Sequence, residues 1–277
     1  MTVNLEQNRP LLGRFKCALS VEQSIQLRDL KKQYAGNYVL KGINLDFAQN
    51  QIVGYIGPNG AGKSTTIKIL TGIISDFEGE ATVMGLDVRK HALEIKQRIG
   101  YIPEQAALYE VLTPLEFLHF VGKLYGMERR VVERKSWDLL RLFDLWDKGN
   151  TRMNQFSKGM KQKVLLISGL IHNPEIIFLD EPLSGLDANA VILIKEILGK
   201  LSHSGKTIFY SSHIMDVVEK ISTRIIIINK GEVIADGDFE SLKKNAHLVS
   251  LESIFTSLTG DEEYLRMAGE FIDILKD

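Results

Sequence analysis

The stretch Gly57-Pro-Asn-Gly-Ala-Gly-Lys-Ser-Thr65 decides the fold, because it matches the pattern G-x-x-x-x-G-K-[ST]. An apolar run, QIVGYI, comes directly before it, and a helix-like run, TTIKILTGII, overlaps its end and follows it. Glycines allow the backbone N–H groups to turn inward around an anion, and the positive end of the following helix points to the same place. A turn with a solvated lysine is the plainer alternative, but it does not explain this strand–loop–helix context.

The segment therefore predicts a loop that binds the phosphates of a nucleoside triphosphate. Lys63 is expected to reach the β- and γ-phosphates, and the hydroxyl of Ser64 is expected to ligate Mg²⁺. The predicted phosphate cradle consists of Gly57, Asn59, Gly60, Ala61, Gly62, Lys63, Ser64 and Thr65.

Composition limits the remaining function classes. The chain has 277 residues, 44% of them hydrophobic, and a net charge of −1, which gives no electrostatic argument for nucleic acid as a partner. Its one cysteine, Cys17, excludes an intramolecular disulfide and suits a reducing compartment. The sequence shows neither a long apolar run nor a signal peptide, so we expect a cytoplasmic or peripheral protein.

The order of patterns along the chain favours an α/β fold with a mainly parallel sheet, because short apolar strands alternate with helical segments. Residues 1–24 are interpreted as an extension, 25–235 as the main domain and 236–277 as a helical tail. A helical insert is expected at about 104–168, where the apolar period becomes 3.6. The apolar residues that fit one face of these helices are Leu115, Leu118, Phe120, Val121, Leu124, Val131, Trp137, Leu140, Leu142 and Leu145.

A second phosphate-site motif ends the apolar strand IIFLDE. Its acids, Asp180 and Glu181, are expected at the carboxyl end of a buried strand, which is where α/β sheets bind ligands. Asp180 is the candidate Mg²⁺ ligand, directly or through water. One Mg²⁺ does not require the neighbouring carboxylate, so Glu181 is the candidate for polarising the attacking water.

Over about residues 25–235 the chain resembles the ATP-binding cassette (ABC) family, in which several motifs occur in the same order. The segment Phe156 to Lys163, FSKGMKQK, is similar to the signature motif of exporter-type members, and LSGLD, ending at Asp187, is similar to the D-loop. The segment GYIPEQ is similar to the Q-loop, and YSSH ends at His213, like the switch histidine of the family.

The resemblance implies an ABC-type P-loop fold, with an N-terminal antiparallel β subdomain and an α-helical subdomain. It implies ATP hydrolysis with Mg²⁺ in a head-to-tail dimer, formed with an identical or closely related subunit. Tyr34 would stack on adenine, while Ser157 and Gly159 of the second subunit, with Asp187 nearby, would close over the γ-phosphate. Lys63, Glu181 and His213 would then act in hydrolysis.

Two positions depart from the family pattern. Glu104 stands where the Q-loop glutamine is expected and Gln105 follows, so either is a candidate for the contact with metal or water. In the signature, Lys158 replaces the first glycine and Met160 replaces the glutamine.

The resemblance also implies a separate transmembrane subunit, which would hold the chain at the cytoplasmic face of the membrane. Its docking region would be roughly 104–112, with apolar residues Ala106, Leu108, Tyr109, Val111 and Leu112. The signature variant and the ending SLESIFTSLTG favour an exporter.

Three alternatives are weighed against this interpretation. A soluble ABC ATPase acting on ribosomes or DNA remains the runner-up, although a second cassette, a long coiled coil and a basic surplus are missing. A metabolic P-loop kinase leaves the signature and D-loop unexplained. A guanine-reading N-K-x-D motif is rejected, because Asn229 and Lys230 are followed by Glu232 instead of aspartate.

Overall fold

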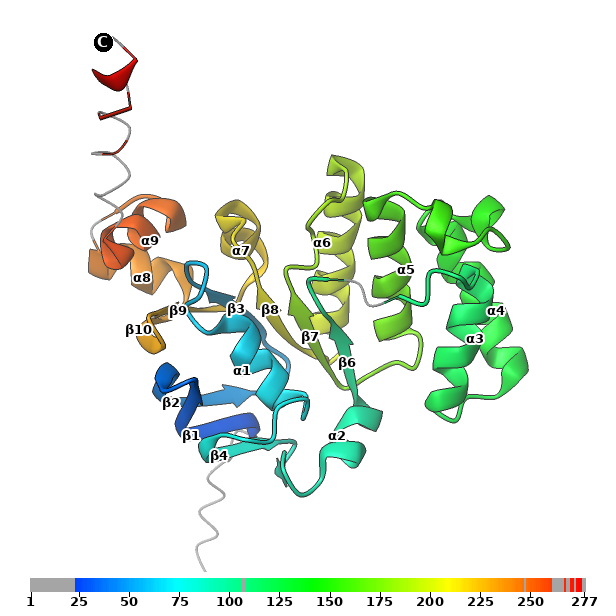
Figure 1. The fold of residues 1–277 in the computed structure, drawn as a ribbon, viewed down its shortest axis with the longest axis horizontal. Coiled ribbons are helices and arrows are strands. Elements are labelled where there is room, and N and C mark those ends of the chain that lie inside the picture. The colour runs from blue at the N-terminus through cyan, green and yellow to red at the C-terminus, as the bar shows by residue number, and fades with distance from the viewer. Residues whose placement is uncertain are drawn as a thin grey trace, which may run out of the picture.

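The computed structural model describes residues 23–105, 108–246 and 248–260, with a few positions near the C-terminus, 267, 270–271 and 273–275. The described chain forms two sheets, one antiparallel and one mainly parallel, together with helices that cover them (Figure 1). Cys17, the expected extension up to residue 22 and most of the last seventeen residues lie outside the described residues. The expected α/β fold, with an N-terminal antiparallel sheet and a mainly parallel core sheet, is confirmed.

The antiparallel sheet has the order β2-β1-β4-β5, from β1 (Gln23–Tyr34), β2 (Asn37–Ala48), β4 (Glu78–Val83) and β5 (Leu86–Asp87). In β2 the residues alternate between buried and more exposed, as they do in a sheet that packs one face on a core. The two long strands β1 and β2 form a hairpin whose turn is Ala35 and Gly36, both with positive φ.

The core sheet has the order β10-β9-β3-β8-β7-β6, and only the β9–β10 pairing is antiparallel. Its strands are β3 (Ile52–Ile56), β6 (Ile99–Ile102), β7 (Ile176–Asp180), β8 (Thr207–Ser211), β9 (Arg224–Asn229) and β10 (Glu232–Gly237). Every residue of β3, β7 and β8 is buried. Neighbours in β3 face opposite sides: Tyr55 packs in the cluster under the antiparallel sheet and Ile56 in the cluster under the helices.

Helices connect these strands and cover both faces of the core sheet (Figure 1). They are α1 (Lys63–Leu70), α2 (Ala92–Arg98), α3 (Pro114–Leu124), α4 (Arg129–Leu142), α5 (Lys158–Leu170), α6 (Ala188–His203), α7 (Met215–Ile221), α8 (Phe239–Ala246) and α9 (Leu251–Thr259). Two 3-10 turns, Trp146–Lys148 and Met153–Gln155, lead into α5. Among the described residues no helix is long and apolar enough to cross a membrane.

The helical insert is present, and half of its predicted apolar face packs in the core: Leu118, Leu140 and Leu145 are buried, and Leu115 and Val121 are partly buried against them. In α3 the buried side chains include Phe117 and Leu118, whereas Phe120 and Leu124 are exposed. In α4 the buried positions are Val132, Ser136 and Leu140, whereas Leu142 is 53% and Trp137 36% exposed. Small and polar residues occupy part of the true contact face: Gly122 approaches Val132 so closely that a Cβ on it would collide.

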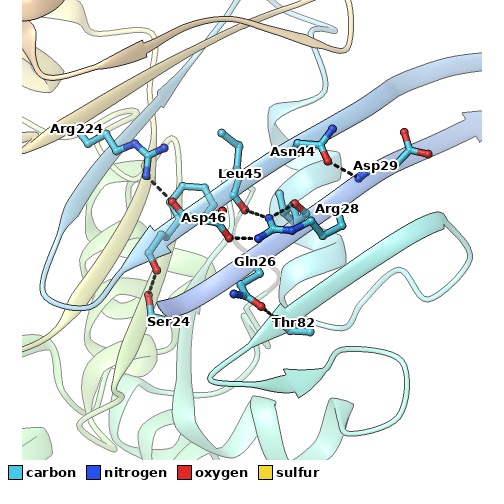
Figure 2. A network of polar contacts seen from close by, with 11 residues as sticks. Ser24, Gln26, Arg28, Asp29, Asn44, Leu45, Asp46, Thr82 and Arg224 are labelled. Carbon is cyan, nitrogen blue, oxygen red and sulfur yellow. Dashed lines mark hydrogen bonds and ion pairs between the residues drawn. The ribbon is translucent and has the colours of Figure 1, made fainter. Parts of the chain in front are cut away.

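A polar network joins the two sheets at the start of the antiparallel one (Figure 2). Arg224 of β9 donates to the backbone carbonyl of Asp46 in β2 and makes a bidentate pair with Asp236 of β10. Arg28 of β1 binds the carboxylate of the same Asp46. Ser24 donates to the carbonyls of Phe47 and Ala48, which fixes the first residues of β1 against the end of β2.

Candidate functional site

The site lies where four neighbouring parallel strands end at the same edge of the core sheet. The phosphate loop follows β3, Asp180 ends β7, Ser211 ends β8, and Glu104 comes two residues after β6. The pairing of β7 with β8 places Asp180 opposite Ser211. Segments far apart in sequence are thus brought together by strand order alone.

The phosphate loop has the backbone geometry that its glycines predict. Gly62 has φ 110°, and a Cβ there would lie 2.5 Å from Cδ2 of Leu40. Gly57 packs against the carbonyl of Ile228, where a side chain has no room. Gly60 also has positive φ, 80°, but faces open space. Two glycines are therefore required by close packing, and the third is free to approach a ligand.

The β9–β10 turn supports the loop from behind. The N–H of Gly231 donates to the carbonyl of Ala61 at 3.1 Å, and the carbonyl of Gly231 accepts from the N–H of Lys41 at 3.0 Å. The turn thus links the loop to β2 of the antiparallel sheet. Asn229 and Lys230, rejected above as guanine readers, belong to this hairpin turn.

Lys63 is the first residue of α1, and its ammonium is folded over the loop. Its Nζ donates to the carbonyls of Gly57 at 2.7 Å and Pro58 at 3.2 Å. Burial lowers the pKa of Lys63, and the charges of Glu181, Asp180 and Glu104 act in the opposite direction. The ammonium is therefore held by the carbonyls of its own loop, in the field of three carboxylates.

A cleft of about 480 Å³ opens above the loop. It is lined by Val39, Asn59, Gly60, Gly62, Lys63, Ser64, Thr65, Glu104, Glu181 and His213. All of these except Val39 are predicted site residues. Gly57 and Ala61 are buried in the support of the loop, and Asp180 lies buried next to the cleft.

Asp180 is 3% exposed and is held by a neighbouring hydroxyl. The Oγ atom of Ser211 donates to Oδ1 of Asp180 at 2.6 Å. This contact fixes the carboxylate and leaves its second oxygen for another partner. Together with the hydroxyl of Ser64 it offers the oxygen ligands that Mg²⁺ prefers, with phosphate and water completing such a shell. Among the described residues no cluster of three or more His, Cys, Asp or Glu forms a metal cage.

Glu181 and His213 are in direct contact across the cleft. Nδ1 of His213 lies 2.7 Å from Oε2 of Glu181, and the backbone N–H of His213 donates to the same oxygen at 3.3 Å. Burial raises the pKa of Glu181, and the contacts with His213 oppose that shift. Glu181 has φ 49°, a left-handed conformation that is uncommon for a residue with a side chain. Its N–H donates to the carbonyl of Ser211, which holds this conformation.

The structure separates the two Q-loop candidates. Glu104 lines the cleft above the phosphate loop with Lys63 and Glu181. Glu104 and Gln105 both line a second cavity, of about 350 Å³, together with Lys158, Lys161 and Gln162 of α5. Glu104 therefore touches both cavities, whereas Gln105 lines only the one beside α5.

The predicted signature and D-loop residues do not line the cleft of their own subunit. Ser157 caps α5, since its hydroxyl accepts from the N–H of Met160 at 3.2 Å. Asp187 caps α6 in the same way, accepting from Ala190 at 2.9 Å. Gly159 lies against the carbonyl of Gly185, which brings the two segments together.

Tyr34 ends β1 and is 45% exposed, outside the residues that line the cleft. The ammonium of Lys32 lies 4.8 Å from the centre of its ring, and that ammonium also pairs with Asp76 at 2.9 Å. The cation supports one face of the ring.

Sequence reasoning missed two residues. Ser211 gave a partial signal, because it ends the predicted strand that follows IIFLD along the chain, but only the fold shows that the two strands pair. Val39 gave no signal, since an alternating strand residue looks like any other until the fold places it over the loop.

The site has counterparts in known proteins. The family described as "ABC transporter" matches residues 40–184. The ABC transporter ATP-binding protein NatA of Bacillus subtilis is 38% identical, over 79% of this chain and 89% of its own length. The linearmycin resistance ATP-binding protein LnrL of the same organism is 37% identical, over 77% and 68%. The Nod factor export ATP-binding protein I of Cupriavidus pinatubonensis is 32% identical, over 89% and 78%.

A solved structure adds a dimer. The ATP-binding cassette MJ0796, a dimer in a post-hydrolysis state with ADP and Pi, is 28% identical to this chain. The two structures superpose with a TM-score of 0.73, over 77% of this chain and 98% of that one.

Proposed function

The chain belongs to the ABC transporter family as an ATP-binding subunit, and we propose that it powers an exporter whose membrane-spanning part is a separate chain. As a member it hydrolyses ATP for transport. One observation carries the assignment of roles: Lys63, Glu181 and His213 line a single cleft above the phosphate loop. Residues 25–235 would form the ATPase unit.

The geometry suggests how this chain's residues divide the chemistry. The loop N–H groups and Lys63 would bind the β- and γ-phosphates, which requires the ammonium to leave the carbonyls of Gly57 and Pro58. Glu181 would accept a proton from, or orient, the water that attacks in line. His213 would hold that carboxylate in place and contact the γ-phosphate.

The donor set fits Mg²⁺. Ser64 and Asp180 would hold it, and Glu104 is the better placed of the two Q-loop candidates because it lines the cleft and Gln105 does not. When bound, Mg²⁺ would neutralise charge that develops on the phosphates. Ser211 would keep the Asp180 carboxylate aimed at the metal.

The complete site would require a second subunit, identical or closely related, arranged head to tail. Ser157 and Gly159 lie outside the cleft of their own chain, so they are available to the nucleotide of a partner. The N-terminus of α5 would face that γ-phosphate. The dimeric cassette MJ0796, which was solved with ADP and Pi, supports this arrangement. Tyr34 would stack on adenine with its free face.

An exposed apolar patch next to the Q-loop supports a membrane partner. Tyr109 is 58% exposed and Val111 67% exposed, and Tyr109 packs edge-on against Phe120. Such groups beside a nucleotide-sensing loop suit a docking site for a membrane subunit. Leu108, by contrast, is buried, and Ala106 lies outside the described residues. The export function of one relative and the resistance function of another favour export.

The deciding experiment isolates the Glu181→Gln variant from native membranes in mild detergent with ATP and Mg²⁺, followed by mass spectrometry. This variant should keep ATP binding and lose turnover by about 10²- to 10⁴-fold. A stoichiometric multi-span membrane protein supports the proposal. Ribosomal or DNA-repair proteins without a membrane partner would support the soluble alternative instead.

A surface variant provides the matched test of docking. Tyr109→Glu combined with Val111→Glu should lose the membrane partner and keep ATP binding. Leu93→Glu is the control, because Leu93 is 79% exposed on α2, away from this patch, and should keep the partner. Equal recovery of the partner with both variants would refute docking at Tyr109 and Val111.

A further inference from the structure

Lys158 departs from the family signature and makes a specific contact in this structure. Its Nζ donates to Oγ of Ser184 in the D-loop at 3.0 Å. Its methylene groups cover Gly185, where a Cβ would lie 2.9 Å from Cδ of Lys158. Gly185 has φ 78°, so the loop passes beneath the lysine in a conformation that suits glycine. A glycine at position 158, as in the usual signature, makes neither contact.

Two other side chains near the start of α5, Gln162 and Lys163, contact the same D-loop segment. Nε2 of Gln162 donates to the carbonyl of Pro182 at 3.1 Å, and this bond is buried. Nζ of Lys163 lies 3.8 Å from Oδ2 of Asp187. Because Lys158 is the most N-terminal of these three side chains, it fixes the part of the loop nearest to the signature turn.

The partner of Lys158 distinguishes it from the next lysine of the helix. Lys161 pairs with the carboxylate of Glu110 at 2.8 Å, as many surface lysines do. Among the described residues Lys158 has no carboxylate within ion-pair distance, and its hydrogen bond goes to a neutral hydroxyl. The contact is thus an exposed hydrogen bond directed to one loop position, and not an ion pair.

We propose that Lys158 is a positioning residue that fastens the D-loop to the signature turn within one subunit. The two segments then meet the nucleotide of the facing subunit as one preassembled surface. Ordering a loop before association lowers the entropy lost when the subunits join, so the dimer forms at lower concentration. This inference rests on the head-to-tail dimer of the proposed function.

The test measures ATP-driven dimerisation by sedimentation in the Glu181→Gln background. Lys158→Met should raise the dimer dissociation constant by about 2- to 12-fold, the equivalent of one net hydrogen bond. Lys158→Arg keeps a donor and should restore most of the affinity. Lys161→Met removes a cation one turn away and should leave the constant unchanged.

Ser184→Ala should reproduce the effect of Lys158→Met, and the double variant should be no weaker than either single one. With Glu181 intact, Lys158→Met should raise the protein concentration that gives half-maximal specific activity and leave the maximal turnover unchanged. Loss of stability alone does not produce this separation. Equal effects of Lys158→Met and Lys161→Met, or additive effects in the double variant, would overturn the proposal.

The Glu181→Gln protein without further changes shows which of the two proposals fails, the head-to-tail dimer or the role of Lys158. If Glu181→Gln itself stays monomeric with saturating ATP, the head-to-tail dimer is refuted, and this inference fails with it. If the parent dimerises and Lys158→Met dimerises equally well, only the role of Lys158 is refuted.

Discussion

Nδ1 of His213 lies 2.7 Å from Oε2 of Glu181, so the two residues proposed to act on the γ-phosphate and on its attacking water are bonded to each other. The carboxylate is mostly buried, with 12% of the side chain exposed, while the imidazole is 67% exposed. His213 therefore covers Glu181 from the solvent side. A change at His213 therefore alters the pKa of Glu181.

The first prediction concerns the acid limb of the pH–activity profile. A base must be deprotonated, and burial raises the pKa of Glu181 while His213 opposes the shift. His213→Ala removes the opposing contacts, so the pKa of Glu181 rises further. The acid limb of the remaining ATPase activity should then move to higher pH, measured as turnover at saturating ATP and Mg²⁺.

The control for this prediction is Glu181→Gln, whose residual activity should lack that limb. Where turnover of His213→Ala is too low, ¹³C NMR titration of the Glu181 carboxyl group reports the same shift. A limb that stays in place, or moves to lower pH, contradicts the coupling.

The second prediction concerns Ser211, whose hydroxyl donates to Asp180 at 2.6 Å inside the protein. Ser211→Ala leaves the carboxylate without this partner and free to turn. Because residues that orient metal ligands typically change metal affinity by 10- to 100-fold, the Mg²⁺ concentration for half-maximal activity should rise by about that factor.

The matched control is Ser168→Ala, which also removes a buried hydroxyl, here bonded to the carbonyl of Leu165 in α5. Ser168→Ala should leave the Mg²⁺ dependence unchanged. An unchanged Mg²⁺ requirement in Ser211→Ala would remove Ser211 from the proposed site.

The phosphate loop and the strand that ends in Asp180 were predictable, because each is a pattern within one short segment and has one physical explanation. Gly62 belongs to the G-x-x-x-x-G-K-[ST] pattern and Asp180 ends an apolar run, and both facts are visible in the sequence. The partner of Asp180 was not identified, since Ser211 reaches it only through the β7–β8 pairing. A sequence motif covers one continuous segment, whereas the Ser211–Asp180 hydrogen bond depends on which strands lie side by side.

The helical insert shows a second limit. The apolar period correctly indicated helices, but the buried face includes Gly122 and Ser136, which a hydrophobic pattern does not weigh. Phe120 and Leu124, which fit the apolar period, are exposed. Exposed apolar side chains fit the helical period as well as buried ones do, so the period alone does not identify the buried face.

The third prediction concerns the polar network that links the two sheets through Arg224. Arg224 is half-buried and binds Asp236 through two nitrogens. It also reaches the backbone carbonyl of Asp46 (Figure 2). Lysine cannot reproduce this fork. Arg224→Lys should therefore lower the free energy of unfolding by about 1.5–3 kcal/mol, the range for hydrogen bonds to charged groups.

The control for Arg224 is another bidentate pair, Arg98 with Glu175, which lies at the surface. Arg98→Lys should cost at most about 1 kcal/mol, because exposed ion pairs contribute little. Both changes in the free energy of unfolding are to be measured by urea denaturation. If Arg98→Lys lowers the free energy of unfolding as much as Arg224→Lys does, Arg224 has no special role in linking the two sheets.

The fourth prediction separates backbone conformation from packing in the phosphate loop. Gly62 and Gly36 both have strongly positive φ, 110° and 87°, but a Cβ at Gly62 meets Leu40 at 2.5 Å, whereas at Gly36 nothing lies within 4 Å. Gly36→Ala should cost about 1–2 kcal/mol for the left-handed conformation alone. Gly62→Ala should cost about 1–3 kcal/mol more, as expected for overpacking.

The two variants should also differ in ligand binding, measured by isothermal titration with ATP. Gly62→Ala displaces the start of α1, together with Lys63, and should abolish binding, whereas Gly36→Ala, in the β1–β2 turn, should keep it. Both proteins must be compared where each is folded, so unfolding curves are recorded first. Retained ATP affinity in a folded Gly62→Ala protein would show that the loop does not depend on this glycine, against the geometry that places Gly62 between Leu40 and the helix.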